Sequence, residues 1–109
     1  MDILDRLLGH DAWTGRVLLL RCQELSEAQL DQPFDAGLGS VRATLEHTIG
    51  NVETWTALIA GGPLPEDGQA DSPPPSVTAL LARHDAASAA FRSLAQRLAA
   101  EGRLDDLWV

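Results

Sequence analysis

The sequence predicts an all-α fold, a bundle of amphipathic helices, and three observations lead to this prediction. Ala and Leu dominate the composition while aromatic residues make up only 5%, which favours helices over a β-rich architecture. Apolar residues recur three and four positions apart in three long segments, so that they share one face of a helix. Capping residues, glycines and prolines bound these segments. With 109 residues, the chain fits a single domain, residues 1–109.

The first long helix is predicted over residues 2–25. Its apolar face consists of Leu4, Leu7, Leu8, Leu18, Cys22 and Leu25, at the spacing of a helix that is buried on one side. Residues 26–30 follow as one extra turn capped by Ser26. Pro33, Gly37 and Gly39 then stop any continuation, because proline and glycine break helices. A short irregular connector is expected there.

The second long helix is expected to begin after Ser40, which stands where an N-cap belongs. Gly61, Gly62 and Pro63 end it. Its apolar stripe is Val41, Leu45, Ile49, Val52, Thr56 and Ile59.

Residues 61–75 are rich in Gly, Pro, Asp and Ser and lack periodicity, which predicts an exposed loop. A tight antiparallel hairpin needs only about 2–8 residues. A loop of this length can instead run along the whole bundle, at up to ~3.3 Å per residue. We therefore expect a crossover loop that leaves the second and third long helices parallel.

The third long helix is predicted from the Ser76 cap to Gly102. Only His84 interrupts its apolar face, formed by Val77, Leu80, Leu81, Ala87, Phe91, Leu94 and Leu98. Residues 103–109 are apolar and acidic with no finished cap. Because four amphipathic helices enclose a shared core more readily than three, a fourth helix is expected to be absent from this chain or supplied by a partner.

Charge and hydropathy exclude several classes of function. Sixteen acidic residues against eight basic ones give a net charge of −8, which disfavours nucleic-acid binding. No apolar run approaches the ~20 residues that a bilayer requires, and Met1 leads into a charged amphipathic segment. A cytoplasmic protein with no membrane contact is expected. Cys22 is the only cysteine, so it is expected to be a buried structural residue.

Two segments carry a resemblance to a known family. Leu7-Leu8-Gly9-His10-Asp11-Ala12-Trp13-Thr14, followed by Leu18-Leu19, resembles the opening of DinB-like proteins. Gly39-Ser40-Val41-Arg42-Ala43-Thr44-Leu45-Glu46-His47-Thr48-Ile49, followed by Glu53 and Trp55, is similar to the second-helix pattern of that family. The likeness is close over residues 7–60 and looser over the remaining chain.

The resemblance implies an up-down-down-up four-helix bundle, of which this chain supplies three long helices. Many DinB-like proteins bind nickel or zinc through one His on the second long helix and a His pair, spaced four apart, on the last. By that likeness His47 is the first metal ligand. The chain has no such His pair, so the site is incomplete here, and the pair is expected beyond Val109 if the chain is part of a longer one. Without the resemblance, His47 reads as an exposed helix histidine with no role.

Other polar residues on the apolar faces have two interpretations each. His84 is expected to be a core histidine with a hydrogen-bond partner, since an unpaired buried polar group costs about 1–3 kcal/mol. It stays open as a ligand, because parallel helices would place it level with His47. Asp11 needs a cation or the second nitrogen of a metal-bound His as partner.

His10 reads as a boundary residue beside Trp13, and both Trp13 and Trp55 are expected to pack rather than stack on a substrate. No catalytic residue is assigned, because no nucleophile triad, paired carboxylates or phosphate-binding Gly loop is present. The leading hypothesis is a divalent-metal-dependent thiol transferase, isomerase or hydrolase that acts on a small molecule with a small thiol. The alternative is a non-catalytic domain that forms a homodimer or binds a partner helix in an apolar groove.

Overall fold

The computed structural model describes residues 2–65 and 73–106. They form four helices and no strand: α1 (Ile3–Cys22), α2 (Glu27–Leu30), α3 (Val41–Ala60) and α4 (Val77–Ala100). The prediction of an all-α fold with three long helices is confirmed.

Short polar side chains start every helix. Asp2 caps α1, and Ser40 and Ser76 cap α3 and α4 by accepting a hydrogen bond from the backbone N–H three residues later. At α2, Ser26 and Gln29 form a reciprocal capping box. The three serine caps lie where the sequence predicted them.

The first helix is shorter than predicted, ending at Cys22 rather than at residue 25. The amide of Gln23 reaches the carbonyls of both Leu19 and Leu20, and the next residues form a turn. This turn lets Ser26 adopt the extended backbone of a cap. Leu25 nevertheless packs against the core, so the apolar periodicity continued beyond the helix itself.

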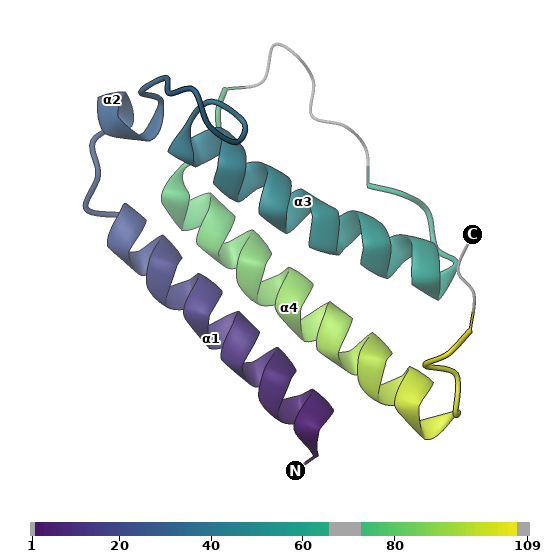
Figure 1. Ribbon diagram of the computed structural model, residues 1–109. Coiled ribbons are helices and arrows are strands. Elements are labelled where there is room, and N and C mark those ends of the chain that lie inside the picture. Colours follow the sequence, from purple (N-terminus) through teal and green to yellow (C-terminus); the bar gives the residue numbers. More distant parts are fainter. Residues whose placement is uncertain (1, 66–72, 107–109) are drawn as a thin grey trace.

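The long helices run in an up-down-down order. Helix α4 packs against both α1 and α3, and Figure 1 shows that α3 and α4 run in the same direction while α1 runs opposite to both. The expectation of parallel helices is therefore confirmed. Gly61 ends α3 in the left-handed conformation, with φ 75°. Residues 61–65 and 73–76 are non-helical, and the middle of the predicted crossover loop, 66–72, lies outside the described residues.

The core lies at the end of the molecule where α1 finishes and α3 and α4 begin (Figure 1). Leu30, from the single turn of α2, is 2% exposed and closes this end of the bundle. The buried cluster consists of Leu19, Cys22, Leu30, Leu45, Ile49, Val77 and Leu80.

A buried arginine, which the sequence analysis did not single out, holds this end together. Arg42 is 4% exposed, and its guanidinium donates hydrogen bonds to Asp31, to Glu27 and to the carbonyl of Pro75. The bonds to Asp31 raise the pKa of Arg42 above its ordinary value, against the opposing effect of burial. This one side chain thus joins α2, α3 and the segment before α4.

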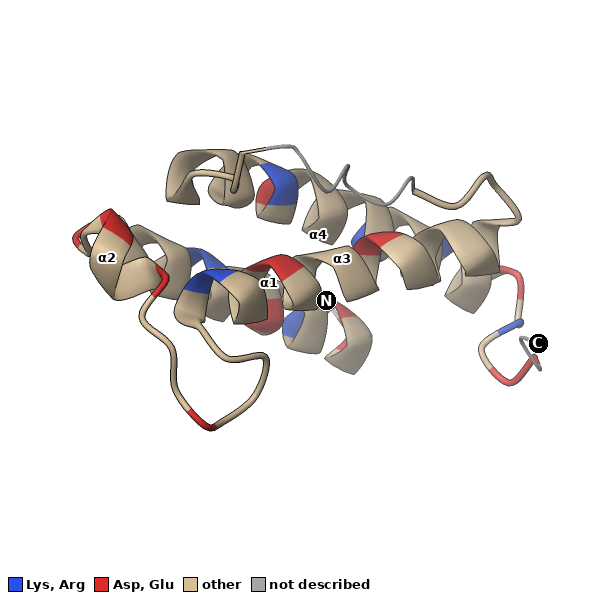
Figure 2. Ribbon diagram, turned by 90° about the horizontal axis from the view of Figure 1, so that it is seen from above, with Lys and Arg blue, Asp and Glu red and all other residues tan. Residues whose placement is uncertain are grey.

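Acidic residues are spread over several elements, among them α2, the connector after it and the segment after α4 (Figure 2). No helix of the described residues is long and apolar enough to cross a membrane.

Candidate functional site

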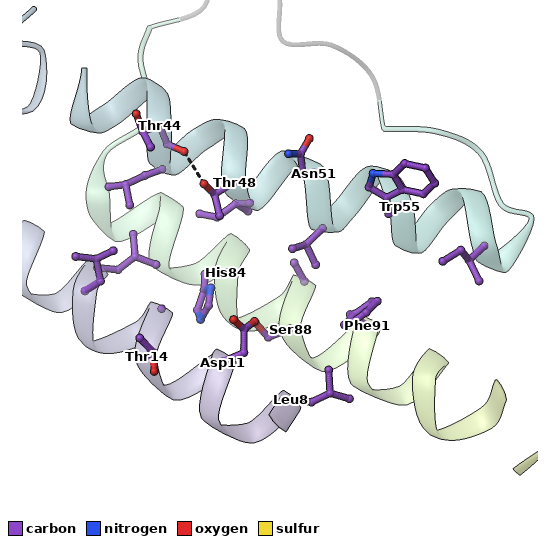
Figure 3. Close-up of a pocket in the computed structure, with 18 residues that line it drawn as sticks. Leu8, Asp11, Thr14, Thr44, Thr48, Asn51, Trp55, His84, Ser88 and Phe91 are labelled. Carbon is purple, nitrogen blue, oxygen red and sulfur yellow. Dashed lines mark hydrogen bonds between the residues drawn. The ribbon is translucent and has the colours of Figure 1, made fainter. Parts of the chain in front are cut away.

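A long apolar groove of about 680 Å³ runs between α1 and α3, with α4 as its floor (Figure 3). The floor carries His84, Ala87, Ser88 and Phe91. The α1 wall is formed by Leu8, Asp11, Thr14, Gly15, Leu18 and Leu19, and the α3 wall by Thr44, Leu45, Thr48, Ile49, Asn51, Val52, Trp55 and Ile59. The groove exists because α1 and α3 both pack on α4 and turn the free edges of their apolar faces toward each other.

The groove continues toward the connector between α2 and α3. A second hollow of about 330 Å³ lies there, lined by Phe34, Ala36 and Gly37. The two hollows share Leu18, Thr44 and Leu45 as lining residues.

His84 lies on the groove floor and is partly buried. Its Nε2 is 2.9 Å from the carbonyl oxygen of Ala12 in α1. A Cβ atom added at Gly15 would lie 2.5 Å from Cε1 of His84, so the ring fits against α1 only because residue 15 has no side chain. The expectation of a histidine with a hydrogen-bond partner is met, and the partner is a backbone carbonyl.

Asp11 lies on the α1 wall, one turn from Gly15, and faces the groove beside Ser88 and His84 (Figure 3). Its side chain makes no hydrogen bond or ion pair with any residue in the ranges 2–65 and 73–106. The partner predicted for this carboxylate, a cation or a histidine nitrogen, is not found among them. Asp11 avoids the cost of burial because it is exposed in the open groove.

His47 lies outside the groove wall and is exposed. Its Nε2 is 3.2 Å from the Nδ2 atom of Asn51. An amide nitrogen can only donate, so Nε2 is the acceptor and keeps its lone pair on the exposed side of α3. Since Asn51 lines the groove, the imidazole lies at the rim.

The helices that carry His47 and His84 run parallel (Figure 1). His84 lines the groove, whereas His47 lies outside its wall. The groove therefore does not bring the two imidazoles together, and their equal level along the bundle stays a prediction.

The aromatic residues and the cysteine lie as follows. The rings of His10 and Trp13 face each other with centroids 6.1 Å apart, and Trp13 is 62% exposed, so it packs on His10 and not in the core. Trp55 is 54% exposed and lines the groove, which differs from the packing role expected for it. Cys22 is 6% exposed within the core, as predicted.

No group of three or more His, Cys, Asp and Glu side chains with the spacing of a metal site occurs in the part of the chain that the structure describes. The sequence analysis expected an apolar groove only in its alternative hypothesis, and it did not place Thr14, Thr48 or Ser88 there. Gly15, in the middle of an amphipathic helix, was a weak signal, because glycine inside a helix costs stability and can have a packing reason.

The family follows from a comparison of the sequence. A model of the DinB superfamily matches residues 10–106, which spans all three long helices and the groove between them. The chain belongs to the DinB superfamily. No curated protein and no solved structure matches it. DinB membership agrees with the bundle described above and confirms the resemblance that residues 7–60 carry.

Proposed function

We propose that this DinB-superfamily chain binds a small, largely apolar molecule in the groove between α1 and α3. The groove itself carries the proposal. Its volume of about 680 Å³ lies within the ~300–1,000 Å³ typical of sites for small molecules. Apolar walls with a few polar groups at defined positions are the usual composition of such sites.

The walls and floor have separate roles in this proposal. Leu8, Trp55 and Phe91 offer apolar surface at the half of the groove furthest from the core (Figure 3), and burial against it contributes about 25 cal/mol per Å². Asp11, His84 and Ser88 are the polar groups near the floor. They would fix the orientation of the bound molecule, because an unpaired polar group in an apolar groove selects its own partner.

The apolar part of the proposal is tested with the neutral fluorescent probe N-phenyl-1-naphthylamine. The wild-type protein is expected to enhance the fluorescence of the probe and shift it to the blue. Thr14→Phe places a ring in the groove and is expected to weaken binding at least about fivefold. Val17→Phe is the matched control, since Val17 is exposed on α1 and does not line the groove. Equal weakening by both variants, or no enhancement at all, would contradict the proposal.

We also propose that His47 is one ligand of a divalent metal, nickel or zinc, as the family likeness suggests. Its support here is an exposed imidazole at the groove rim whose Nε2 lone pair is held by a weak amide contact. The described residues do not complete a ligand set around it, so we assign no reaction step to the metal. When bound, such a metal activates a thiol or a water by lowering its pKa, which is the chemistry of thiol transferases, isomerases and hydrolases.

Calorimetric titration with Zn²⁺ and Ni²⁺ tests this ligand. His47→Ala is expected to lower the affinity for these metal ions at least about tenfold. His10→Ala is the matched control, because His10 is also exposed on a helix surface and faces Trp13. Equal affinities of wild type and His47→Ala would remove His47 from the proposed site.

A second candidate function, self-association, is favoured by the exposed apolar rim of the same groove. Leu18 and Trp55 are each 54% exposed on facing walls, and an apolar helix of a second copy can cover such a groove. Sedimentation velocity tests this homodimer. Leu18→Glu should dissociate it, whereas Leu20→Glu, on an exposed position outside the groove, should not. A monomer at all concentrations would reject the second candidate and leave the first intact.

A further inference from the structure

Three polar side chains lie near one another on the groove floor because of the antiparallel register of α1 and α4. Gly15 faces His84 across this interface. One turn back along α1 is Asp11, and one turn forward along α4 is Ser88. Residues four apart share a helix face, so Asp11 lies opposite Ser88. Figure 3 shows Asp11, Ser88 and His84 gathered at this position, and all three line the groove.

The hydrogen bond to Ala12 fixes the protonation pattern of a neutral His84. The Ala12 carbonyl oxygen can only accept, so Nε2 of His84 must carry the proton. In neutral imidazole the other nitrogen, Nδ1, then carries a lone pair. Nδ1 makes no hydrogen bond within the described residues, and it is not among their fully buried unsatisfied atoms. It is therefore an acceptor without a partner among those residues, and it is not fully buried.

Asp11 adds a negative charge that no cation in the described part of the chain neutralises. Two arginines of the α1–α4 interface are paired with other carboxylates: Arg16 with Asp85 and Arg92 with Asp5. On the α3 side, Arg83 pairs with Glu53. The remaining polar groups on the α3 wall, Thr44, Thr48 and Asn51, are uncharged. The groove thus presents one unpaired carboxylate between apolar walls.

We propose that Asp11, His84 and Ser88 bind the protonated amino group of an apolar amine. This inference rests on the proposed function and names its substrate class. An ammonium group has three N–H donors and no acceptor, and the groove floor offers three acceptors: a carboxylate oxygen, Nδ1 of His84 and Oγ of Ser88. The charge of the ammonium complements Asp11, while the apolar part of the ligand contacts Phe91 and Trp55. Ligands with a carboxylate in this position are repelled by Asp11.

Three probes of one shape test the charge preference: 2-phenylethylamine, 2-phenylethanol and phenylacetate. Their affinities are measured by ligand-observed NMR titration at pH 7 with EDTA present, so that no metal bridges probe and protein. The amine is expected to bind at least about tenfold tighter than the alcohol, and phenylacetate weakest. In Asp11→Asn the amine should lose most of its advantage over the alcohol, because the charge that attracts the ammonium group is gone.

Asp35→Asn is the matched control, because Asp35 is exposed in the connector before α3, does not line the groove, and changes the net charge equally. Ser88→Ala should weaken the binding of the amine about threefold, because one of the three acceptors is removed. Equal binding of all three probes to the wild type, or an equal effect of Asp11→Asn and Asp35→Asn, would overturn the amine assignment while the groove function stands. If none of the probes binds, the proposed function fails together with this inference.

Discussion

Gly15 shows how a single missing side chain positions a polar group. The His84 ring occupies the space that a Cβ at residue 15 would need, at 2.5 Å from Cε1, and this contact lets the ring reach the Ala12 carbonyl. Gly50 lies inside α3 with no atom within 4 Å of the equivalent position. Gly15 and Gly50 therefore differ in the space around them, although alanine is the better helix former at both positions.

Gly15→Ala is expected to lower the free energy of unfolding by about 1–2 kcal/mol, because His84 must shift and lose its hydrogen bond. Gly50→Ala should raise the same free energy by about 0.5–1 kcal/mol. Urea denaturation measures both. In a His84→Ala background the Gly15→Ala substitution should become stabilising, and a persistent loss there would show that the ring is not what limits residue 15.

The burial of Cys22 makes the stability of the protein depend on pH. Burial raises the pKa of its thiol above the ordinary value, so the folded protein keeps the proton to higher pH than the unfolded chain does. The contribution to stability is complete below the pKa of the unfolded thiol, about 8.5. It is lost as the pH rises through the folded pKa.

Between pH 8 and 9.5 the free energy of unfolding is therefore expected to fall by up to about 1 kcal/mol. No Lys or Tyr side chain titrates in this window, because the chain contains neither residue. Urea titrations of wild type and Cys22→Ala at both pH values measure the difference. A thiol reagent should label Cys22 only as fast as the folded protein opens to expose this side chain. Rapid labelling of the native protein would contradict the burial of Cys22.

At the scale of elements, Arg42 attaches the four-residue α2 to the bundle. A single helical turn is not stable alone, so its position depends on Leu30 in the core and on the contacts of Glu27 and Asp31 with the guanidinium. Arg83 makes a comparable ion pair with Glu53, but its side chain is 36% exposed. A comparison of these two residues therefore shows how burial of an arginine side chain affects the strength of its contacts.

Arg42→Ala is expected to cost about 3 kcal/mol, because it leaves the Pro75 carbonyl without its donor and removes three hydrogen bonds to the carboxylates of Asp31 and Glu27. Arg83→Ala should cost less than about 1 kcal/mol, since solvent weakens a partly exposed ion pair. Chemical denaturation measures both losses, and hydrogen exchange in α2 should rise only in the first variant. Equal costs would mean that burial of Arg42 does not strengthen its contacts.

At the scale of the whole molecule, repulsion among like charges opposes folding. The net charge is −8, and the acidic residues are spread over several elements (Figure 2). Several ion pairs among the described residues join two well-exposed side chains, for example 48% and 47% in the pair Arg16–Asp85. Salt weakens both the ion pairs and the general repulsion between like charges. Thermal stability therefore rises with salt if the repulsion is the larger of the two, and falls if the ion pairs are.

We expect repulsion to dominate, so that Tm rises by a few degrees between about 0.02 and 0.3 M NaCl. Differential scanning calorimetry at constant pH measures this shift, and an equal ionic strength of KCl should give the same result. A fall in Tm would instead show that the ion pairs, with Arg42 foremost, outweigh the excess negative charge.

The sequence by itself determined the three long helices, the serine caps and the parallel course of α3 and α4. These features depend on periodicity, capping and loop length, which are local properties of the chain. It also placed Cys22 in the core, and its resemblance to DinB-like proteins was confirmed over residues 10–106.

Only the tertiary structure decided which side chains share the groove. Neighbouring helices can slide along each other and rotate without changing their apolar patterns, so register and rotation come from packing. That is why His84 meets the Ala12 carbonyl, Asp11 faces the groove, and His47 stays exposed at its rim. The burial of Arg42 was not predictable from the sequence for the same reason. Its partners Glu27, Asp31 and Pro75 come together only in the folded protein, and no local sequence pattern indicates this.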